Sequence, residues 1–328
     1  MSDVAIRTRH LTRDFGPVRA VDDITFEVPA GIVFGFLGAN GAGKTTTIHL
    51  LLGLLEPTAG GAEVLGCDIR TQGRQIREQT GALLEFTGLY ERLTAGENLE
   101  FYGRVWHMPA AERQARSQEL LTHFGLWDRR DDRVGTWSRG MKQKLAVARA
   151  LFHHPRLVFF DEPTAGLDPV AAASLRDDMA ALAAREGVTV FLTTHNLPEA
   201  ERLCNLVGVI RQGKLLALGA PDQLRAQTGS PRVEVVGEGF GESALAALRA
   251  RPEVAQAALE NGHLLIDLHT TPGASQPKAA PLVAALVQAG AQIEEVRRGQ
   301  ASLEDVFLSL MEDDRAQTQV PASQEAAR

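Results

Sequence analysis

The pattern of apolar and polar residues differs between the start of the chain and its middle. Within the first 30 residues the two kinds alternate in short runs, as in residues 24–28, and glycine and proline separate the runs. This pattern predicts an antiparallel sheet with tight turns. Residues 32–37, 157–160 and 188–192 are mostly apolar, which is typical of strands that are buried on both faces. A helix-like stretch rich in alanine and leucine, residues 169–185, lies between the last two, and this alternation predicts a parallel sheet.

Helical spacing of apolar residues appears in two further parts of this first region. Residues 45–55 follow the apolar run at 32–37 after a glycine-rich loop. Residues from about 89 to 151 also have a mostly helical pattern. We therefore expect a helical subdomain over about 88–152, inserted between strands of the parallel sheet.

The pattern changes again after residues 228–231, which form a turn-rich joint. The predicted elements beyond it are strand 232–236, helix 242–250, strands 254–259 and 263–268, helix 279–288, strand 292–296 and a last helix from Ser302. This β-α-β-β-α-β order predicts a ferredoxin-like domain. We therefore expect a first domain over 1–228, a small α+β domain over 231–314 and a disordered tail over 315–328.

The composition is that of an ordinary globular protein, with 44% hydrophobic and 23% charged residues. The 34 basic and 41 acidic residues give a net charge of −7, which counts against a chain that coats nucleic acid. Cys67 and Cys204 are far apart and form neither a zinc spacing nor a disulfide framework, so we expect reduced thiols. The N-terminal residues lack the apolar segment of a signal peptide. The apolar runs are far shorter than the roughly 18 residues of a membrane span, so we expect a chain that does not cross a membrane.

Residues 38–45 give the most specific chemical signal. They read Gly-Ala-Asn-Gly-Ala-Gly-Lys-Thr and lie between an apolar strand and a helix, as a phosphate-binding loop requires. Glycines let successive N–H groups converge on an anion, and the following helix points its positive end at the same anion. We expect Lys44 to reach the β- and γ-phosphates and Thr45 to bind Mg²⁺. The predicted phosphate-binding residues are Gly38, Asn40, Gly41, Ala42, Gly43, Lys44, Thr45 and Thr46.

Polar residues that follow two other apolar strands are the next candidates. Asp161 and Glu162 end the run 157–160, where Asp161 would hold Mg²⁺ and Glu162 would deprotonate the attacking water. Two acids that simply end a strand at the surface are the alternative, and the nearby phosphate-binding loop counts against it. His195 follows the run 188–192, at the edge where ligand groups gather in such sheets. It would donate to the γ-phosphate, although a structural role is the commoner one for a single histidine.

Together these residues resemble, in their order along the chain, the motifs of ATP-binding cassette (ABC) ATPases. The loop at 38–45 resembles Walker A and residues 161–163 resemble Walker B, while residues 165–168 and His195 match two further motifs. Residues 137–141, Trp-Ser-Arg-Gly-Met, resemble the family signature, which is usually Leu-Ser-Gly-Gly-Gln. The resemblance covers residues 4 to about 225. Residues 302–307 resemble the C-terminal ending of drug- and lipid-exporting members.

The resemblance implies an α/β P-loop NTPase cassette with a RecA-like parallel sheet, an antiparallel β subdomain and a helical subdomain. It also implies ATP and Mg²⁺ as cofactors and a head-to-tail pair of copies with two ATP molecules between them. Ser138 and Gly140 would then bind the γ-phosphate held by the second copy, since a helix N-terminus suits an anion. Asp168 would line the seam between the copies. Phe15 occupies the place of the aromatic residue that stacks on adenine, and a core position in an edge strand is the alternative.

Two residues depart from the family pattern. Glu85 stands where the family usually has a glutamine that touches Mg²⁺ and the attacking water. A carboxylate is a stronger Mg²⁺ ligand than an amide, so we predict tighter metal retention; the variant loosely resembles exporters for peptide-antibiotic self-protection. Arg139 replaces a glycine of the signature, and its side chain either points away from the nucleotide or adds charge to the γ-phosphate site. We favour the first alternative because Ser138 and Gly140 already supply the usual contacts.

The favoured interpretation is the ATP-hydrolysing subunit of a membrane exporter, peripheral at the cytoplasmic face of the cell membrane. Its partners would be a second copy of the chain and a separate membrane-spanning permease. Residues 84–99 and the helical subdomain would receive the short cytoplasmic helices of this permease. A soluble ATPase that acts on nucleic acid or the ribosome is the alternative; its relatives usually carry two cassettes, and one motif set is present here. No nucleic-acid partner is therefore expected. A nucleotide-gated structural protein is a third interpretation, which the presence of Glu162 weakens.

Overall fold

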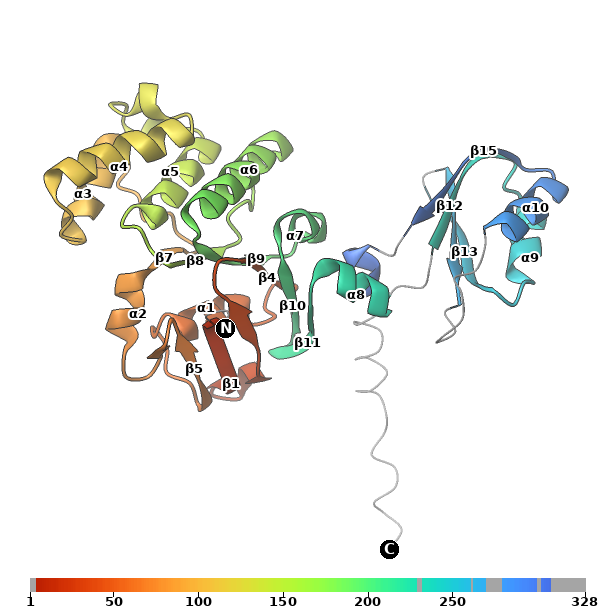
Figure 1. The fold of residues 1–328 in the computed structure, drawn as a ribbon, viewed down its shortest axis with the longest axis horizontal. Helices are drawn as coiled ribbons and strands as arrows, with labels where there is room; N and C mark the ends of the chain where they lie inside the picture. The colour runs from red at the N-terminus through yellow and green to blue at the C-terminus, as the bar shows by residue number, and fades with distance from the viewer. Residues whose placement is uncertain (1–3, 229–231, 261, 270–278, 300–301, 308–328) are drawn as a thin grey trace, which may run out of the picture. The chain divides into compact units, whose positions relative to one another are not determined.

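The computed structural model describes residues 4–228, 232–260, 262–269, 279–299 and 302–307. The chain divides into two compact units, Met1–Ala220 and Pro221–Arg328 (Figure 1). The boundary lies at Ala220, earlier than the predicted 228, because the sheet of the first unit is complete when its last strand ends at Gly219. The predicted tail at 315–328 lies outside the described residues.

The first unit contains a six-stranded sheet with the order β11-β10-β4-β9-β8-β7. Its strands are β4 (Val33–Leu37), β7 (Thr80–Leu83), β8 (Leu157–Asp161), β9 (Thr189–Thr194), β10 (Leu206–Arg211) and β11 (Lys214–Gly219). All neighbouring pairs are parallel except β10 with β11. Every residue of β8 and β9 is buried, as their apolar sequences predict. The predicted parallel sheet is thus confirmed, and the carboxyl ends of five strands meet along one edge.

An antiparallel sheet accompanies it and shares its core. This sheet consists of β1 (Val4–Phe15), β2 (Val18–Ile24), β3 (Glu27–Pro29), β5 (Ala59–Val64) and β6 (Cys67–Asp68). Phe26 stacks on Phe34 of β4 with ring centroids 5.5 Å apart, and Phe34 lies 5.1 Å from Phe191 of β9. A single hydrophobic core therefore joins the two sheets.

The helices of the first unit are α1 (Lys44–Leu51), α2 (Gly73–Gln79), α3 (Ala95–Val105), α4 (Ala110–His123), α5 (Arg139–Leu151), α6 (Pro169–Glu186) and α7 (Leu197–Leu203), with short 3-10 turns at Trp127–Arg129 and Val134–Thr136. Helix α1 ends before the predicted residue 55, since Gly53 adopts a left-handed conformation with φ +62°. Helices α3, α4 and α5 form the predicted helical subdomain (Figure 1). Thr94 and Glu97 start α3 with reciprocal side-chain-to-backbone hydrogen bonds.

Ion pairs join the helical subdomain to α6. Buried Arg116 of α4 contacts Glu186 at the end of α6 at 2.7 Å. Lys144 of α5 contacts Asp178 of α6 at 2.7 Å and donates to the Ser174 hydroxyl at 2.9 Å. Helices α5 and α6 lie side by side (Figure 1) and are thus linked through Lys144 as well as by packing.

The second unit has the predicted ferredoxin-like topology. Its elements are α8 (Pro221–Thr228), β12 (Arg232–Glu238), α9 (Glu242–Arg249), β13 (Val254–Glu260), β14 (His263–Leu268), α10 (Ala280–Gln288) and β15 (Gln292–Gly299), and residues 303–307 are helical. The strands pair antiparallel in the order β13-β14-β12-β15. Alternate residues such as Val235 and Ile266 pack against Leu248 of α9 and Leu286 of α10. Within the described ranges of the whole chain, no helix has both the length and the apolar character to span a membrane.

Candidate nucleotide-binding site

The loop between β4 and α1 has a backbone that only glycine accommodates at two positions. A Cβ on Gly38 would lie 2.4 Å from the carbonyl oxygen of Ile210. Gly43 has φ +108°, and a Cβ there would lie 2.4 Å from the carbonyl oxygen of Ala20. Side chains at these positions would push the loop away from β10 and β2, so the glycines fix its curvature. The loop leads directly into α1, whose first residue is Lys44.

The Lys44 side chain lies inside the curve of this loop. Its ammonium donates to the carbonyl oxygens of Gly38 at 2.7 Å and Ala39 at 3.2 Å. The same nitrogen lies 3.1 Å from Oε1 of Glu162. The side chain is almost fully buried, so its charge acts in a medium of lower effective dielectric than water.

Asp161 and Thr45 meet beside the loop. The Thr45 hydroxyl donates to Oδ2 of Asp161 at 2.6 Å, and the Thr193 hydroxyl donates to Oδ1 at 2.5 Å. Oxygen donors of this kind are what Mg²⁺ prefers, so the pair suits the ion. The described residues contain no group of three or more acidic, histidine or cysteine side chains arranged to hold a metal unaided.

Glu162 is held in an unusual backbone conformation next to His195. Its φ is +51°, a left-handed value that costs a non-glycine residue about 1–3 kcal/mol. Oε2 of Glu162 lies 2.7 Å from Nδ1 of His195, and its backbone N–H donates to the Thr193 hydroxyl at 3.1 Å. The residues that follow β8 and β9, which were predicted separately as site residues, thus form one carboxylate–imidazole pair.

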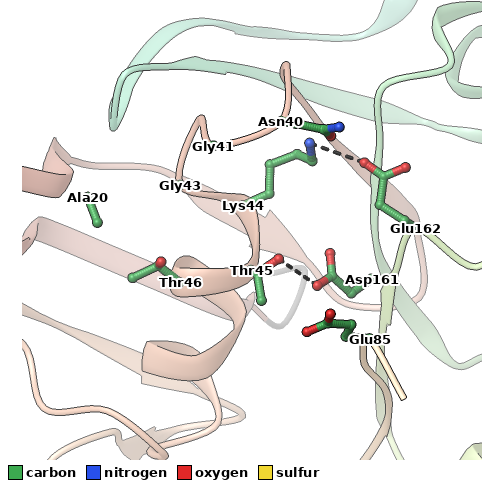
Figure 2. Close-up of a pocket in the computed structure, with 10 residues that line it drawn as sticks. All are labelled: Ala20, Asn40, Gly41, Gly43, Lys44, Thr45, Thr46, Glu85, Asp161 and Glu162. Carbon is green, nitrogen blue, oxygen red and sulfur yellow. Dashed lines mark hydrogen bonds and ion pairs between the residues drawn. The ribbon is translucent and has the colours of Figure 1, made fainter. Parts of the chain in front are cut away.

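A cavity of about 300 Å³ lies beside Lys44, Asp161 and Glu162 (Figure 2). It is lined by Ala20, Asn40, Gly41, Gly43, Lys44, Thr45, Thr46, Glu85, Asp161 and Glu162. Glu85 follows β7, and Figure 2 shows it among the lining residues together with Asp161. All the predicted phosphate-binding residues at 38–46 and the predicted metal ligands, except Gly38 and Ala42, therefore line one concavity, together with Ala20 of β2, which no sequence signal marked.

The residues expected to act across a dimer lie outside this cavity. Ser138 caps α5 by accepting from the Met141 N–H at 3.3 Å, and Asp168 caps α6 by accepting from the Ala171 N–H at 2.9 Å. Gly140 lies in the first turn of α5, where a Cβ would come 3.3 Å from that of Ala171. Ser138 and Asp168 thus each start a helix.

Phe15 and Arg139 have partners within the chain. Phe15 ends β1, is 44% exposed and lies under the Arg13 guanidinium, 4.5 Å from the ring centroid. This exposure argues against the alternative of a core position. Arg139 donates to the carbonyl oxygen of Ala165 at 2.9 Å and lies against Gly166. The segment before α6 therefore engages the guanidinium, which favours the alternative in which Arg139 turns away from the nucleotide.

Residues 21–165 match the profile of the ABC transporter family. The daunorubicin resistance ATP-binding protein DrrA3 of Streptomyces coeruleorubidus is 36% identical over 315 residues, which is 96% of this chain and 98% of that protein. The chain belongs to the ABC transporter ATP-binding proteins. As a member of this family it binds and hydrolyses ATP. The predicted resemblance and fold class are confirmed.

Other relatives of this ABC ATPase are named for export and transport. The Nod factor export ATP-binding protein I of Paraburkholderia xenovorans is 40% identical over 72% of this chain and 78% of its own. The bacitracin transport ATP-binding protein BcrA of Bacillus licheniformis is 41% identical over 64% of this chain and 68% of its own. A solved structure of an ATP-binding subunit of an ABC transporter aligns with a TM-score of 0.62 at 33% identity, over 68% of this chain and 92% of that one.

Proposed function

We propose that this ABC ATPase powers the export of an antibiotic or a similar drug-like compound, from the cytoplasmic face of the membrane. The observation that carries the proposal is the alignment with DrrA3, which takes in nearly the whole of both chains. The alignment with BcrA, in contrast, is 211 residues long, about the length of the first unit alone. The second unit is thus a feature that the chain has in common with daunorubicin-resistance relatives.

The geometry supports definite roles in ATP hydrolysis. Lys44 would bind the β- and γ-phosphates, while Thr45 and Asp161 would hold the Mg²⁺ that neutralises their charge. Glu162 would accept a proton from the attacking water, because it lines the cavity beside Lys44. His195 would orient Glu162 and donate to the γ-phosphate, since its imidazole lies 2.7 Å from that carboxylate.

A second copy of the chain would complete the site. Ser138 and Gly140 lie at the start of α5, where backbone N–H groups of the first turn and the helix dipole favour an anion. They are outside the cavity of their own chain, so the γ-phosphate they suit would belong to the partner copy. Asp168 would lie at the same seam, and Phe15, exposed at the end of β1, would stack on adenine.

An apolar groove in the first unit would receive the membrane-spanning subunit. It encloses about 270 Å³, and its lining includes Leu54, Leu84, Tyr102, Val105, Trp106 and His153. The Trp106 ring stacks on His153 at 4.0 Å, and burial lowers the pKa of His153 to about 4, so the imidazole is neutral near pH 7. Phe86 and Phe101 add exposed aromatic surface nearby in the sequence. A mostly apolar groove of this kind, whose lining also includes Arg77 and Arg149, suits the apolar face of a short amphipathic helix.

Replacing Val105 with glutamate is expected to separate the chain from its membrane partner. Val105 lines the groove on α3 and is 53% exposed, so a charge there opposes docking without filling the core. We expect the tagged wild-type chain to co-purify a multi-span protein from detergent-solubilised membranes, and the variant to lose it while still binding ATP.

Val287→Glu is the matched control, because Val287 is a helical valine of the second unit with 55% exposure. It should retain the same membrane protein. Recovery of ribosomes or nucleic acid by the wild-type chain, with no membrane protein, would instead support the soluble ATPase.

Replacing Glu85 with glutamine tests its proposed contact with Mg²⁺. A carboxylate binds Mg²⁺ more strongly than an amide, so the variant should need more Mg²⁺ for half-maximal ATPase activity. We expect a shift of about tenfold, which corresponds to about 1.4 kcal/mol. Glu78→Gln, on the exposed side of α2, is the control. An unchanged Mg²⁺ dependence for Glu85→Gln would refute the metal contact.

A further inference from the structure

Glu199 is a fully buried carboxylate. It lies in α7, the helix that follows the carboxyl end of β9. Its position is in the first turn of this helix, where its N–H donates to the Asn196 side chain at 3.1 Å. Burial, with a smaller contribution from the charge of Glu162, raises the pKa of Glu199 above its ordinary value. Burying a carboxylate is costly unless its oxygens accept hydrogen bonds, so the partners of Glu199 are informative.

Two threonine hydroxyls donate to this carboxylate from different loops. Thr164 donates to both oxygens at 3.0 Å, and Thr194 donates to Oε2 at 2.9 Å. Thr164 lies two residues after Glu162 in the loop that leaves β8, whereas Thr194 ends β9 immediately before His195. One buried carboxylate therefore binds the two segments that carry the two halves of the carboxylate–imidazole pair.

We propose that Glu199 is a positioning residue for ATP hydrolysis, which through Thr164 and Thr194 holds Glu162 and His195 at their 2.7 Å separation. The proposal rests on the roles proposed above for these two residues. Glu162 needs such support because its left-handed backbone is strained and relaxes unless the surrounding structure opposes it. A displacement of about 1 Å in a catalytic group costs up to about 100-fold in rate, so the link acts on turnover.

Paired substitutions of the two threonines distinguish the effect of losing a hydroxyl donor from an effect on folding. Thr194→Val and Thr164→Val keep the side-chain shape and remove the donor, whereas Thr194→Ser and Thr164→Ser keep the donor. We expect each valine variant to lower kcat by about 10- to 100-fold, with little change in the KM for ATP. The serine variants should recover most of kcat, and Thr122→Val on the exposed surface of α4 should match the wild type.

A double-mutant cycle decides whether Thr194 acts through His195. In a His195→Ala background, Thr194→Val should cause little further loss of kcat, because the residue it positions is gone. Additive losses would overturn the proposal. So would valine variants whose kcat, expressed per ATP-binding protein, equals that of the wild type, since the hydroxyls would then serve folding alone.

Glu199→Gln, which keeps one acceptor oxygen, should give an intermediate kcat. Glu162→Gln distinguishes a failure of the proposed catalytic roles from a failure of the positioning role of Glu199. If that variant hydrolyses ATP normally, the proposed roles of Glu162 and His195 fail. If it is inactive while the threonine and Glu199 variants are fully active, only the positioning role fails.

Discussion

Replacing Glu162 with glutamine is expected to lower ATP turnover by about 10²- to 10⁴-fold while ATP binding is retained. Glutamine keeps the shape of the side chain but cannot take a proton from water. The proposed phosphate contacts of Lys44 and the oxygens of Asp161 are unaffected, so ATP should still bind. Turnover is measured by phosphate release, and binding by equilibrium dialysis with labelled ATP.

The same variant should accumulate as an ATP-bound dimer, since hydrolysis is what separates the proposed pair of copies. Size-exclusion chromatography with ATP and Mg²⁺ checks this expectation against the wild type. Glu78→Gln, a conservative change on the surface, should remain active and behave as the wild type. Retained turnover in Glu162→Gln would remove Glu162 as the general base.

Replacing Lys44 with methionine is expected to weaken ATP binding itself, by about 10- to 100-fold. Methionine matches the length of the side chain but lacks the buried ammonium that lies between the loop carbonyls and Glu162. A hydrogen bond to a charged group contributes about 1.5–3 kcal/mol, which converts to a loss of this size. Titration with a fluorescent ATP analogue measures the affinity.

Lys214→Met controls for the loss of a lysine, because Lys214 is exposed and does not line the cavity. It should bind ATP as tightly as the wild type. The two predictions together separate binding from chemistry: Lys44→Met lowers affinity and turnover, whereas Glu162→Gln lowers turnover alone. Wild-type affinity in Lys44→Met would show that the backbone of the loop binds the phosphates unaided.

Local sequence signals were sufficient to predict the buried strands and the phosphate-binding loop. The apolar runs at 157–160 and 188–192 became β8 and β9 because strands buried on both faces need apolar residues throughout. The β-α-β-β-α-β pattern of the second unit was equally clear, since alternate residues of β12 and β14 face its helices. The end of α1 was missed because helical spacing continues beyond Gly53, where the backbone turns left-handed.

Contacts between distant segments could not be predicted in this way. Glu199 and Thr164 are 35 residues apart, and neither belongs to a pattern that marks a buried carboxylate. Thr193, whose hydroxyl donates to Asp161, directly follows the apolar run 188–192, and no sequence signal marked it. The sequence placed His195 and Glu162 at the ligand-binding edge of the sheet, but their contact with each other and the contacts behind them required the folded chain.

The ion pair between α5 and α6 has a consequence for assembly. Ser138 and Asp168 start these two helices, and Lys144 links the helices through Asp178. Two N-termini proposed to face a second copy are therefore fixed relative to each other before the copies meet. Association then loses less conformational entropy than it would with two independently moving segments. A larger share of the interaction energy therefore contributes to the affinity of the closed pair and to its specificity for the correct partner surface.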